Sequence, residues 1–156
     1  MIEIEVPGFR TLSLDLLVCD YNGTLARDGH LLSEARAGIS RVSSALQVQI
    51  ITGDTFGTAR EELHGLPVQL FVVPAERQAE AKLELIQRHS AQRVVAFGNG
   101  RNDRMMLAEA AFGVGVIGDE GIATEALVAS DIVVLHIADA FELLLEPRRL
   151  IAGLRA

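Results

Sequence analysis

Short apolar segments alternate with amphipathic helical segments along most of this chain. Four apolar runs, at 16–19, 48–51, 70–73 and 94–97, are dominated by Val, Ile, Leu and Phe. A strand that is apolar on both faces is typical of a parallel sheet covered by helices on each side. The alternation of strands with helices favours the same architecture. We therefore predict an α/β fold, with an open, Rossmann-like parallel sheet between two helical layers.

The remaining segments complete this pattern. Apolar residues alternate with charged ones over 2–6, Pro7-Gly8 turns the chain, and 12–16 alternate again, which predicts an N-terminal β-hairpin. Asp28-Gly29 predicts a tight turn inside a small flap over 24–32. We expect helices over 33–45 (with Ser33 as N-cap), 58–64, 77–89, from 102 or 103 onward, 139–145 and 148–154, and two further strands over 112–116 and 132–135.

Composition and charge exclude several classes of function. With 156 residues, 49% hydrophobic and 22% charged, the chain has the size of one folded domain, and we expect residues 1–156 to form it. The net charge of -7 argues against nucleic-acid binding, which needs a basic face. There is no apolar stretch of about 20 residues for a membrane span, and the first residues lack signal-peptide features. We expect a cytoplasmic protein without nucleic-acid or membrane partners.

Polar clusters follow three of the predicted strands directly. Asp20-Tyr21-Asn22-Gly23-Thr24 follows the first apolar run, Thr52-Gly53-Asp54 follows the second, and Gly98-Asn99-Gly100 follows the run at 94–97. In parallel α/β sheets the chemistry gathers beyond the carboxyl ends of the strands. Because the three clusters share this topological position, we expect them to form one site.

The spacing of these clusters resembles that of the haloacid dehalogenase (HAD) superfamily of aspartate-nucleophile phosphotransferases. The matching positions are Asp20-x-x-Gly23-Thr24, Thr52-Gly53, Lys82 and Gly98-x-Gly100-x-Asn102-Asp103. In more detail, the pattern is similar to the phosphorylation domain of P-type ATPases without its membrane and nucleotide-binding parts. The resemblance covers residues 14–135 and implies an open parallel sheet with the nucleophile after a central strand.

The resemblance implies a role in phosphoryl transfer for each matching residue. Asp20 would be the nucleophile that forms an aspartyl phosphate. Lys82, the only lysine of the chain, would supply a fixed positive charge, and Thr52 would donate its hydroxyl group to the phosphoryl oxygens. Three residues would bind the same group through free backbone N–H groups, namely Gly23, Thr24 and Gly53.

The implied metal site departs from the superfamily pattern at two positions. Mg²⁺ is the implied cofactor, held by the Asp20 carboxylate, the Asn22 backbone carbonyl and the Asn99 side chain, with Asp103 further out. Phosphatases of the superfamily usually have an aspartate at the position of Asn22, as general acid and base, and an acidic metal ligand at that of Asn99. We therefore expect weaker Mg²⁺ binding, and a preference for acyl and aryl phosphates, whose leaving groups are already stable.

Two functions follow from this pattern. The leading one is a Mg²⁺-dependent HAD-type phosphatase, a hydrolase of phosphoric monoesters or acyl phosphates whose activity could be low. The alternative is a catalytically weak regulatory or phosphate-binding interaction module, because Asn22 and Asn99 replace the usual acids.

Neither the segment between Asp20 and Thr52 nor that between Val73 and Lys82 has room for a cap domain. Such an open site suits a macromolecular phosphorylated substrate or shielding by a neighbouring subunit, so we expect a homo-oligomer.

Two other ligand classes are disfavoured. Residues 113–118 match the glycine pattern of a dinucleotide-binding loop, but these glycines lie inside a predicted strand and do not open a helix. The four histidines are scattered without the spacing of zinc ligands. We expect neither a nicotinamide nucleotide nor zinc.

Overall fold

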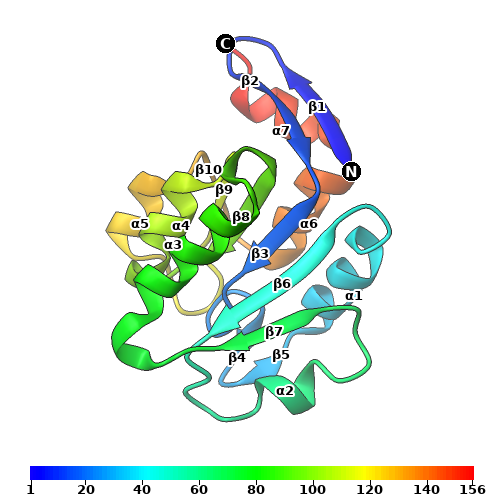
Figure 1. Ribbon diagram of the computed structural model, residues 1–156. Coiled ribbons are helices and arrows are strands. Elements are labelled where there is room, and N and C mark those ends of the chain that lie inside the picture. Colours follow the sequence, from blue (N-terminus) through cyan, green and yellow to red (C-terminus); the bar gives the residue numbers. More distant parts are fainter.

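The computed structural model describes residues 1–156 and is built around a six-stranded parallel sheet (Figure 1). The strands are β3 (Leu16–Cys19), β6 (Gln47–Thr52), β7 (Gln69–Val72), β8 (Val94–Gly98), β9 (Phe112–Val116) and β10 (Ile132–Val134). Their order in the sheet is β10-β9-β8-β3-β6-β7, and all neighbours are parallel. The predicted α/β architecture is therefore confirmed, with β3 in the interior of the sheet.

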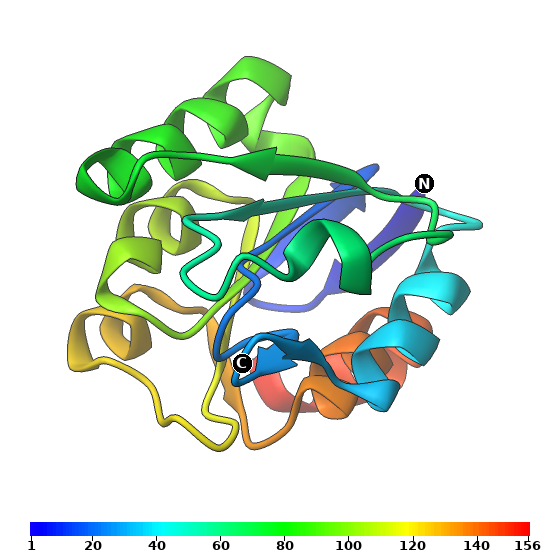
Figure 2. The same ribbon diagram turned by 90° about the horizontal axis from the view of Figure 1, so that it is seen from below.

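Helices cover both faces of this sheet (Figures 1 and 2). One face carries α3 (Gln78–His89), α4 (Arg104–Glu109) and α5 (Thr124–Ala129), and the other carries α1 (Ser33–Val42) and α6 (Ile137–Leu145). Successive residues of β3 pack into different layers, since Leu16 and Val18 join the cluster on the α3–α4 side, whereas Leu17 and Cys19 join the α1–α6 side. This two-sided burial explains why the strand is apolar at every position.

The smaller elements lie at the ends of the sheet. The predicted hairpin is formed by β1 (Ile2–Val6) and β2 (Arg10–Leu14), which pair antiparallel, and α7 (Pro147–Leu154) contacts β1. The predicted flap is formed by β4 (Ala26–Arg27) and β5 (His30–Leu31), and short α2 (Ala59–Glu62) lies against β5. Single 3-10 turns occupy Ala75–Arg77, Ala91–Arg93 and Arg101–Asp103. No cap domain interrupts the chain between β3 and β6 or between β7 and α3.

The structure corrects some element boundaries. The helix α5 was not predicted, because its six residues are too short to show a clear helical period. Ser33 is the first residue of α1 and not its N-cap, and no side chain caps that end. The helix α1 also ends at Val42, three residues earlier than predicted. No helix is long and apolar enough to cross a membrane.

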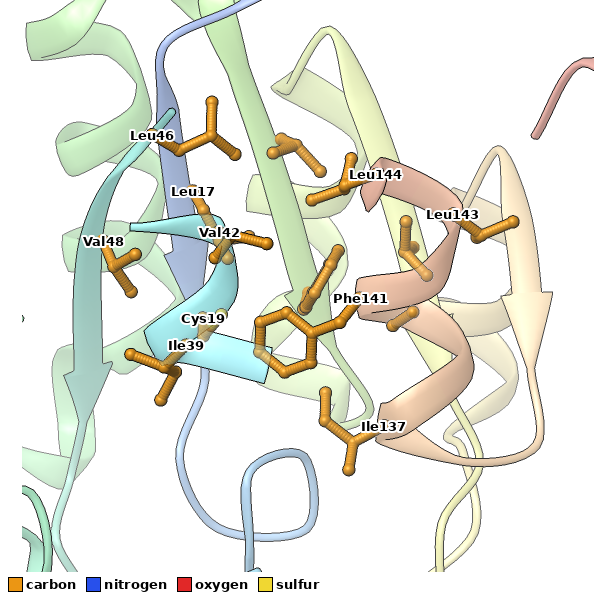
Figure 3. Close-up of a cluster of buried hydrophobic side chains, with 14 of the residues drawn as sticks. Leu17, Cys19, Ile39, Val42, Leu46, Val48, Ile137, Phe141, Leu143 and Leu144 are labelled. Atoms are coloured by element: carbon orange, nitrogen blue, oxygen red, sulfur yellow. The ribbon is translucent and has the colours of Figure 1, made fainter. Parts of the chain in front are cut away.

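Figure 3 shows Phe141 of α6 pointing toward α1. The packing of these two helices depends on a glycine of α1. Phe141 of α6 lies edge-on to Phe97 of β8, with ring centroids 5.4 Å apart and an interplanar angle of 78°. Gly38 of α1 faces the Phe141 ring so closely that a Cβ atom at this position would overlap it. A glycine inside a helix is therefore required here by close approach.

We expect Gly38→Ala to lower the free energy of unfolding by about 1–3 kcal/mol, the usual cost of overpacking a core. This loss should exceed the gain of about 1 kcal/mol that alanine brings over glycine through its higher helix propensity. Urea unfolding monitored by circular dichroism measures it. In a Phe141→Leu background the same substitution should cost less, and an equal cost in both backgrounds would contradict the steric explanation.

Candidate active site

The polar clusters meet at the carboxyl edge of the sheet, as predicted. Cys19 of β3 pairs with Ile50 of β6 and with Phe97 of β8, so the three strands end side by side. The backbone N–H of Asp20 continues the ladder by donating to the carbonyl oxygen of Phe97 at 3.0 Å. The register of the sheet thereby fixes the position of the Asp20 carboxylate between the ends of its neighbours.

Lys82 lies in the middle of this edge and joins two carboxylates. Its ammonium group donates to Asp20 Oδ1 at 2.8 Å and to Asp103 Oδ1 at 2.6 Å, and to the amide oxygen of Asn102 at 3.2 Å. The Lys82 and Asp103 side chains are fully buried, and that of Asp20 is 9% exposed. Two buried carboxylates therefore share one ammonium group, and the cluster carries a net negative charge.

Burial and neighbouring charge set the ionisation of this cluster. Burial and then repulsion by Asp103 raise the pKa of Asp20 to about 6, although the Lys82 charge acts in the opposite direction. Burial alone would lower the pKa of Lys82, but attraction by Asp20 and Asp103 outweighs it and raises that pKa above its usual range. Lys82 therefore remains positively charged at any working pH.

Asp103 organises the loop behind the site. Its second carboxylate oxygen accepts hydrogen bonds from the backbone N–H groups of Asn99 at 2.9 Å and Gly100 at 2.8 Å. With one oxygen on the ammonium of Lys82 and the other on this loop, Asp103 has no exposed surface. Asp103 thus orients Lys82 and the Asn99 backbone and does not line the cavity beside Asp20. Its expected place further from Mg²⁺ than Asp20 stays a prediction.

Three further oxygens gather around Asp20. The Thr24 hydroxyl lies 3.4 Å from Asp20 Oδ2 and 3.3 Å from Asn99 Oδ1. The Asn99 amide nitrogen donates to the carbonyl oxygen of Gly121 at 3.1 Å, which turns the amide oxygen toward Thr24. The side-chain oxygen of Asn22 is buried and has no hydrogen-bond partner. An unpaired buried oxygen of this kind needs a ligand, a cation or water.

A cavity of about 200 Å³ opens beside Asp20, and we call it the phosphate cavity. Its lining contains no hydrophobic residue and consists of Asp20, Asn22, Thr52, Gly53, Thr55, Gln78, Asn99, Gly100, Asn102 and Glu120. The Thr52 hydroxyl oxygen accepts a hydrogen bond from the Asp54 backbone at 2.9 Å, so its proton remains free to donate into the cavity. The Gly53 backbone N–H also makes no hydrogen bond within the protein.

The prediction of free backbone N–H groups at Gly23 and Thr24 is wrong. The N–H of Gly23 donates to Ala26 at 2.9 Å and that of Thr24 donates to Tyr21 at 3.3 Å, because both belong to the turn that leads into the flap. Neither residue lines the phosphate cavity. Gly23 is needed for space instead, since a Cβ atom there would overlap the Glu120 carboxylate and the Asn99 amide.

Sequence reasoning did not identify Gln78, Thr55 and Glu120 as site residues. Gln78 precedes Lys82 by one helical turn and accepts a hydrogen bond from the Asn102 amide at 2.9 Å, so helical spacing could have indicated it. Thr55 lies only three residues after Thr52, in the loop that follows β6. Glu120 comes from the loop between β9 and α5, and no local pattern points to it.

The sequence is similar to that of one curated protein. No known protein-family model matches the chain. The uncharacterized protein MJ0073 of Methanocaldococcus jannaschii is 42% identical over 83 residues, which are 52% of this chain and 89% of that protein. This identity and coverage show a shared family, although the relative's name carries no function.

Several solved structures share the architecture. The 3-deoxy-D-manno-octulosonate 8-phosphate phosphatase of Moraxella catarrhalis, in complex with magnesium, phosphate and KDO, has a TM-score of 0.72 at 17% identity and covers 90% of each chain. The cobalt-bound enzyme of Haemophilus influenzae has a TM-score of 0.72 at 16% identity, with 88% of this chain and 90% of that one covered. A putative HAD family hydrolase of Streptomyces avermitilis has a TM-score of 0.65 at 18% identity, with coverage of 92% and 85%. The chain thus belongs to the family of MJ0073 and has the fold of the HAD hydrolases.

Proposed function

We propose that this protein is a Mg²⁺-dependent phosphohydrolase of the HAD type that forms an aspartyl phosphate on Asp20. The observation that carries the proposal is the Asp20 carboxylate at the end of β3, held 2.8 Å from a buried ammonium group and facing a wholly polar cavity. The similar fold of a phosphatase solved with magnesium, phosphate and KDO supports the same reaction class. The closer similarity to P-type ATPase domains remains a proposal.

Asp20 would act as the nucleophile. One of its carboxylate oxygens forms a bond to phosphorus while the bond from phosphorus to the leaving oxygen breaks, and water later releases phosphate from Asp20. Lys82 holds Asp20 in place and offsets the repulsion between the carboxylate and the phosphoryl group. Because Lys82 is fully buried and bound to Asp103 as well, its charge needs no reorganisation during the reaction.

Thr52 and Gly53 would bind the phosphoryl oxygens. The Thr52 hydroxyl proton is free because its oxygen already accepts from Asp54, and the Gly53 N–H has no partner in the protein. Gly53 also has no room for a side chain, since a Cβ atom would lie 2.5 Å from the Gln78 amide nitrogen. Thr52 ends β6 and Gly53 follows it, and the neighbouring strand β3 ends directly before Asp20.

The oxygens in the phosphate cavity fit Mg²⁺. The Asp20 carboxylate, the Asn22 backbone carbonyl and Asn99 Oδ1 would hold the ion, since all three residues line the cavity. The buried side-chain oxygen of Asn22, which has no hydrogen-bond partner, is a further oxygen of this residue that a cation could satisfy. Mg²⁺ in such sites usually binds one or two carboxylates, substrate phosphate and several waters. When bound, the cation supplies charge stabilisation to the phosphoryl group. No group of three His, Cys, Asp or Glu residues gathers here, which favours weak binding.

The test is a phosphatase assay with Mg²⁺ and 4-nitrophenyl phosphate or acetyl phosphate. We expect Asp20→Asn to lower turnover by roughly 10⁴-fold or to background, because the nucleophile is lost. The matched control is Glu109→Gln, an exposed acid on α4 outside the cavity, which should keep wild-type activity. Turnover that survives in Asp20→Asn would contradict the proposal, and a beryllofluoride adduct on Asp20 would support it.

The second candidate function is a phosphate-binding interaction module with little turnover. Asn22 and Asn99 at the cavity favour it, because neither amide can transfer a proton or bring the charge of a metal-binding acid. Calorimetry would distinguish the two functions, since binding of phosphate without Asp20-dependent turnover identifies the module.

The absence of a cap domain also favours a macromolecular substrate or shielding by a neighbouring subunit in a homo-oligomer.

A further inference from the structure

Glu120 is an acidic residue that lines the phosphate cavity, although no sequence motif indicated it. It lies in the loop between β9 and α5, is exposed to solvent, and makes no hydrogen bond or ion pair with another side chain. Its neighbour Asp119, in contrast, pairs with Arg27 of the flap at 3.6 Å. The Glu120 carboxylate therefore has no partner within the protein and is accessible to a ligand in the cavity.

A second cavity of about 380 Å³ adjoins the first, and we call it the flap cavity. It lies between the flap, the loop after β9 and the beginning of α6, and its lining includes Thr24, Arg27, Leu32 and Ile137. Glu120 is the one residue that lines both the flap cavity and the phosphate cavity. The backbone at Gly23 lies at the same border, since a side chain there would overlap Glu120 and Asn99.

We propose that Glu120 is the general acid and base of the reaction, the role that Asn22 cannot perform. This inference rests on the proposed function. A phosphate ester bound with its phosphoryl group in the phosphate cavity, against Asp20, would extend its leaving group into the flap cavity. The oxygen that joins the two parts then lies at the border of the cavities, where Glu120 is located.

The two steps of the reaction balance with Glu120 in this role. In the first, Asp20 bonds to phosphorus, the bond to the leaving oxygen breaks with its electron pair on that oxygen, and the Glu120 carboxyl group gives it a proton. In the second, the Glu120 carboxylate takes a proton from water while the water oxygen bonds to phosphorus and the bond to Asp20 breaks. Alcohol and phosphate are released, and Glu120 is protonated again.

The test compares Glu120→Gln with wild type on two substrates. With 2-phenylethyl phosphate, whose alkoxide needs a proton, we expect turnover to fall by about 10²–10⁴-fold, the usual contribution of general acid–base catalysis. With 4-nitrophenyl phosphate, whose phenolate leaves unaided, the first step should survive and the second should be slow. Stopped-flow mixing should then show a burst of about one equivalent of nitrophenolate, followed by slow turnover.

Control measurements separate proton transfer from other roles. Mn²⁺ affinity measured by electron paramagnetic resonance should be unchanged in Glu120→Gln, because the proposal does not use Glu120 to hold the metal. Glu120→Asp should recover part of the activity, and Glu109→Gln should behave as wild type. Equal losses on both substrates without a burst, or lost Mn²⁺ binding, would overturn the assignment.

The experiments give different results if the role of Glu120 is wrong and if the proposed function is wrong. Wild-type rates of Glu120→Gln on both substrates would remove Glu120 from the chemistry and leave the role of Asp20 intact. A wild-type protein without Asp20-dependent turnover would overturn both proposals together.

Discussion

Replacing Lys82 with methionine is expected to lower the free energy of unfolding by about 3–5 kcal/mol, the range for removing one partner of a buried ion pair. The variant would leave the carboxylates of Asp20 and Asp103 in the same buried pocket without the ammonium that both contact. Methionine retains most of the volume, so the loss would report charge and not a cavity. Urea unfolding at neutral pH in the presence of EDTA measures it.

The pH dependence identifies the cause of this loss. Without Lys82, burial and repulsion by Asp103 keep the pKa of the Asp20 carboxyl group in the folded state above its value in the unfolded state. Protonation then favours the folded state, so the deficit of Lys82→Met should shrink as the pH falls toward about 4. The double variant Asp20→Asn/Lys82→Met should lose less stability than Lys82→Met alone, because one of the two charges is removed. A deficit that is independent of pH and of Asp20 would contradict this explanation.

The sequence could predict the parts of the site that lie at strand ends. Asp20 and Thr52 follow apolar runs whose parallel pairing brings their ends together, so their meeting depends only on the order of the elements. Lys82 required the spacing of a known superfamily, because nothing local shows that a charged residue on α3 turns inward. Its contacts with Asp20 and Asp103 agree with that expectation.

Other features depend on contacts that a linear pattern does not contain. The superfamily resemblance implied free N–H groups at Gly23 and Thr24, but both groups donate hydrogen bonds within the turn that leads into the flap. Glu120 reaches the cavity because the loop after β9 folds across Gly23, a contact between segments almost a hundred residues apart. The two cavities and their shared border are likewise properties of the folded chain.

The variant that should abolish turnover, Asp20→Asn, is also expected to be more stable than the wild type. In the metal-free protein, burial and then repulsion by Asp103 raise the pKa of the Asp20 carboxyl group from its ordinary value of about 3.8 to about 6. Between these pH values the Asp20 carboxyl group stays protonated in the folded state and is ionised in the unfolded state. The free energy of unfolding of the wild type therefore falls as the pH rises from about 4 to 6. Asparagine carries no charge to desolvate and can still accept the hydrogen bond from Lys82. Its advantage should therefore be near zero at pH 4 and reach about 1–3 kcal/mol above pH 6.

Thermal and urea unfolding across this pH range, with EDTA present, measure the difference. Asp54→Asn is the matched control, because Asp54 also follows a strand of the sheet but accepts backbone hydrogen bonds from Thr58 and Ala59 and lies outside the charged cluster. This control should not gain stability as the pH rises. Saturating Mg²⁺ should reduce the advantage of Asp20→Asn, since the cation would offset the charge of the wild-type carboxylate. An Asp20→Asn variant that is less stable than wild type at pH 7 would show that the ion pair with Lys82 outweighs burial, and that the site is not held under electrostatic strain for its chemistry.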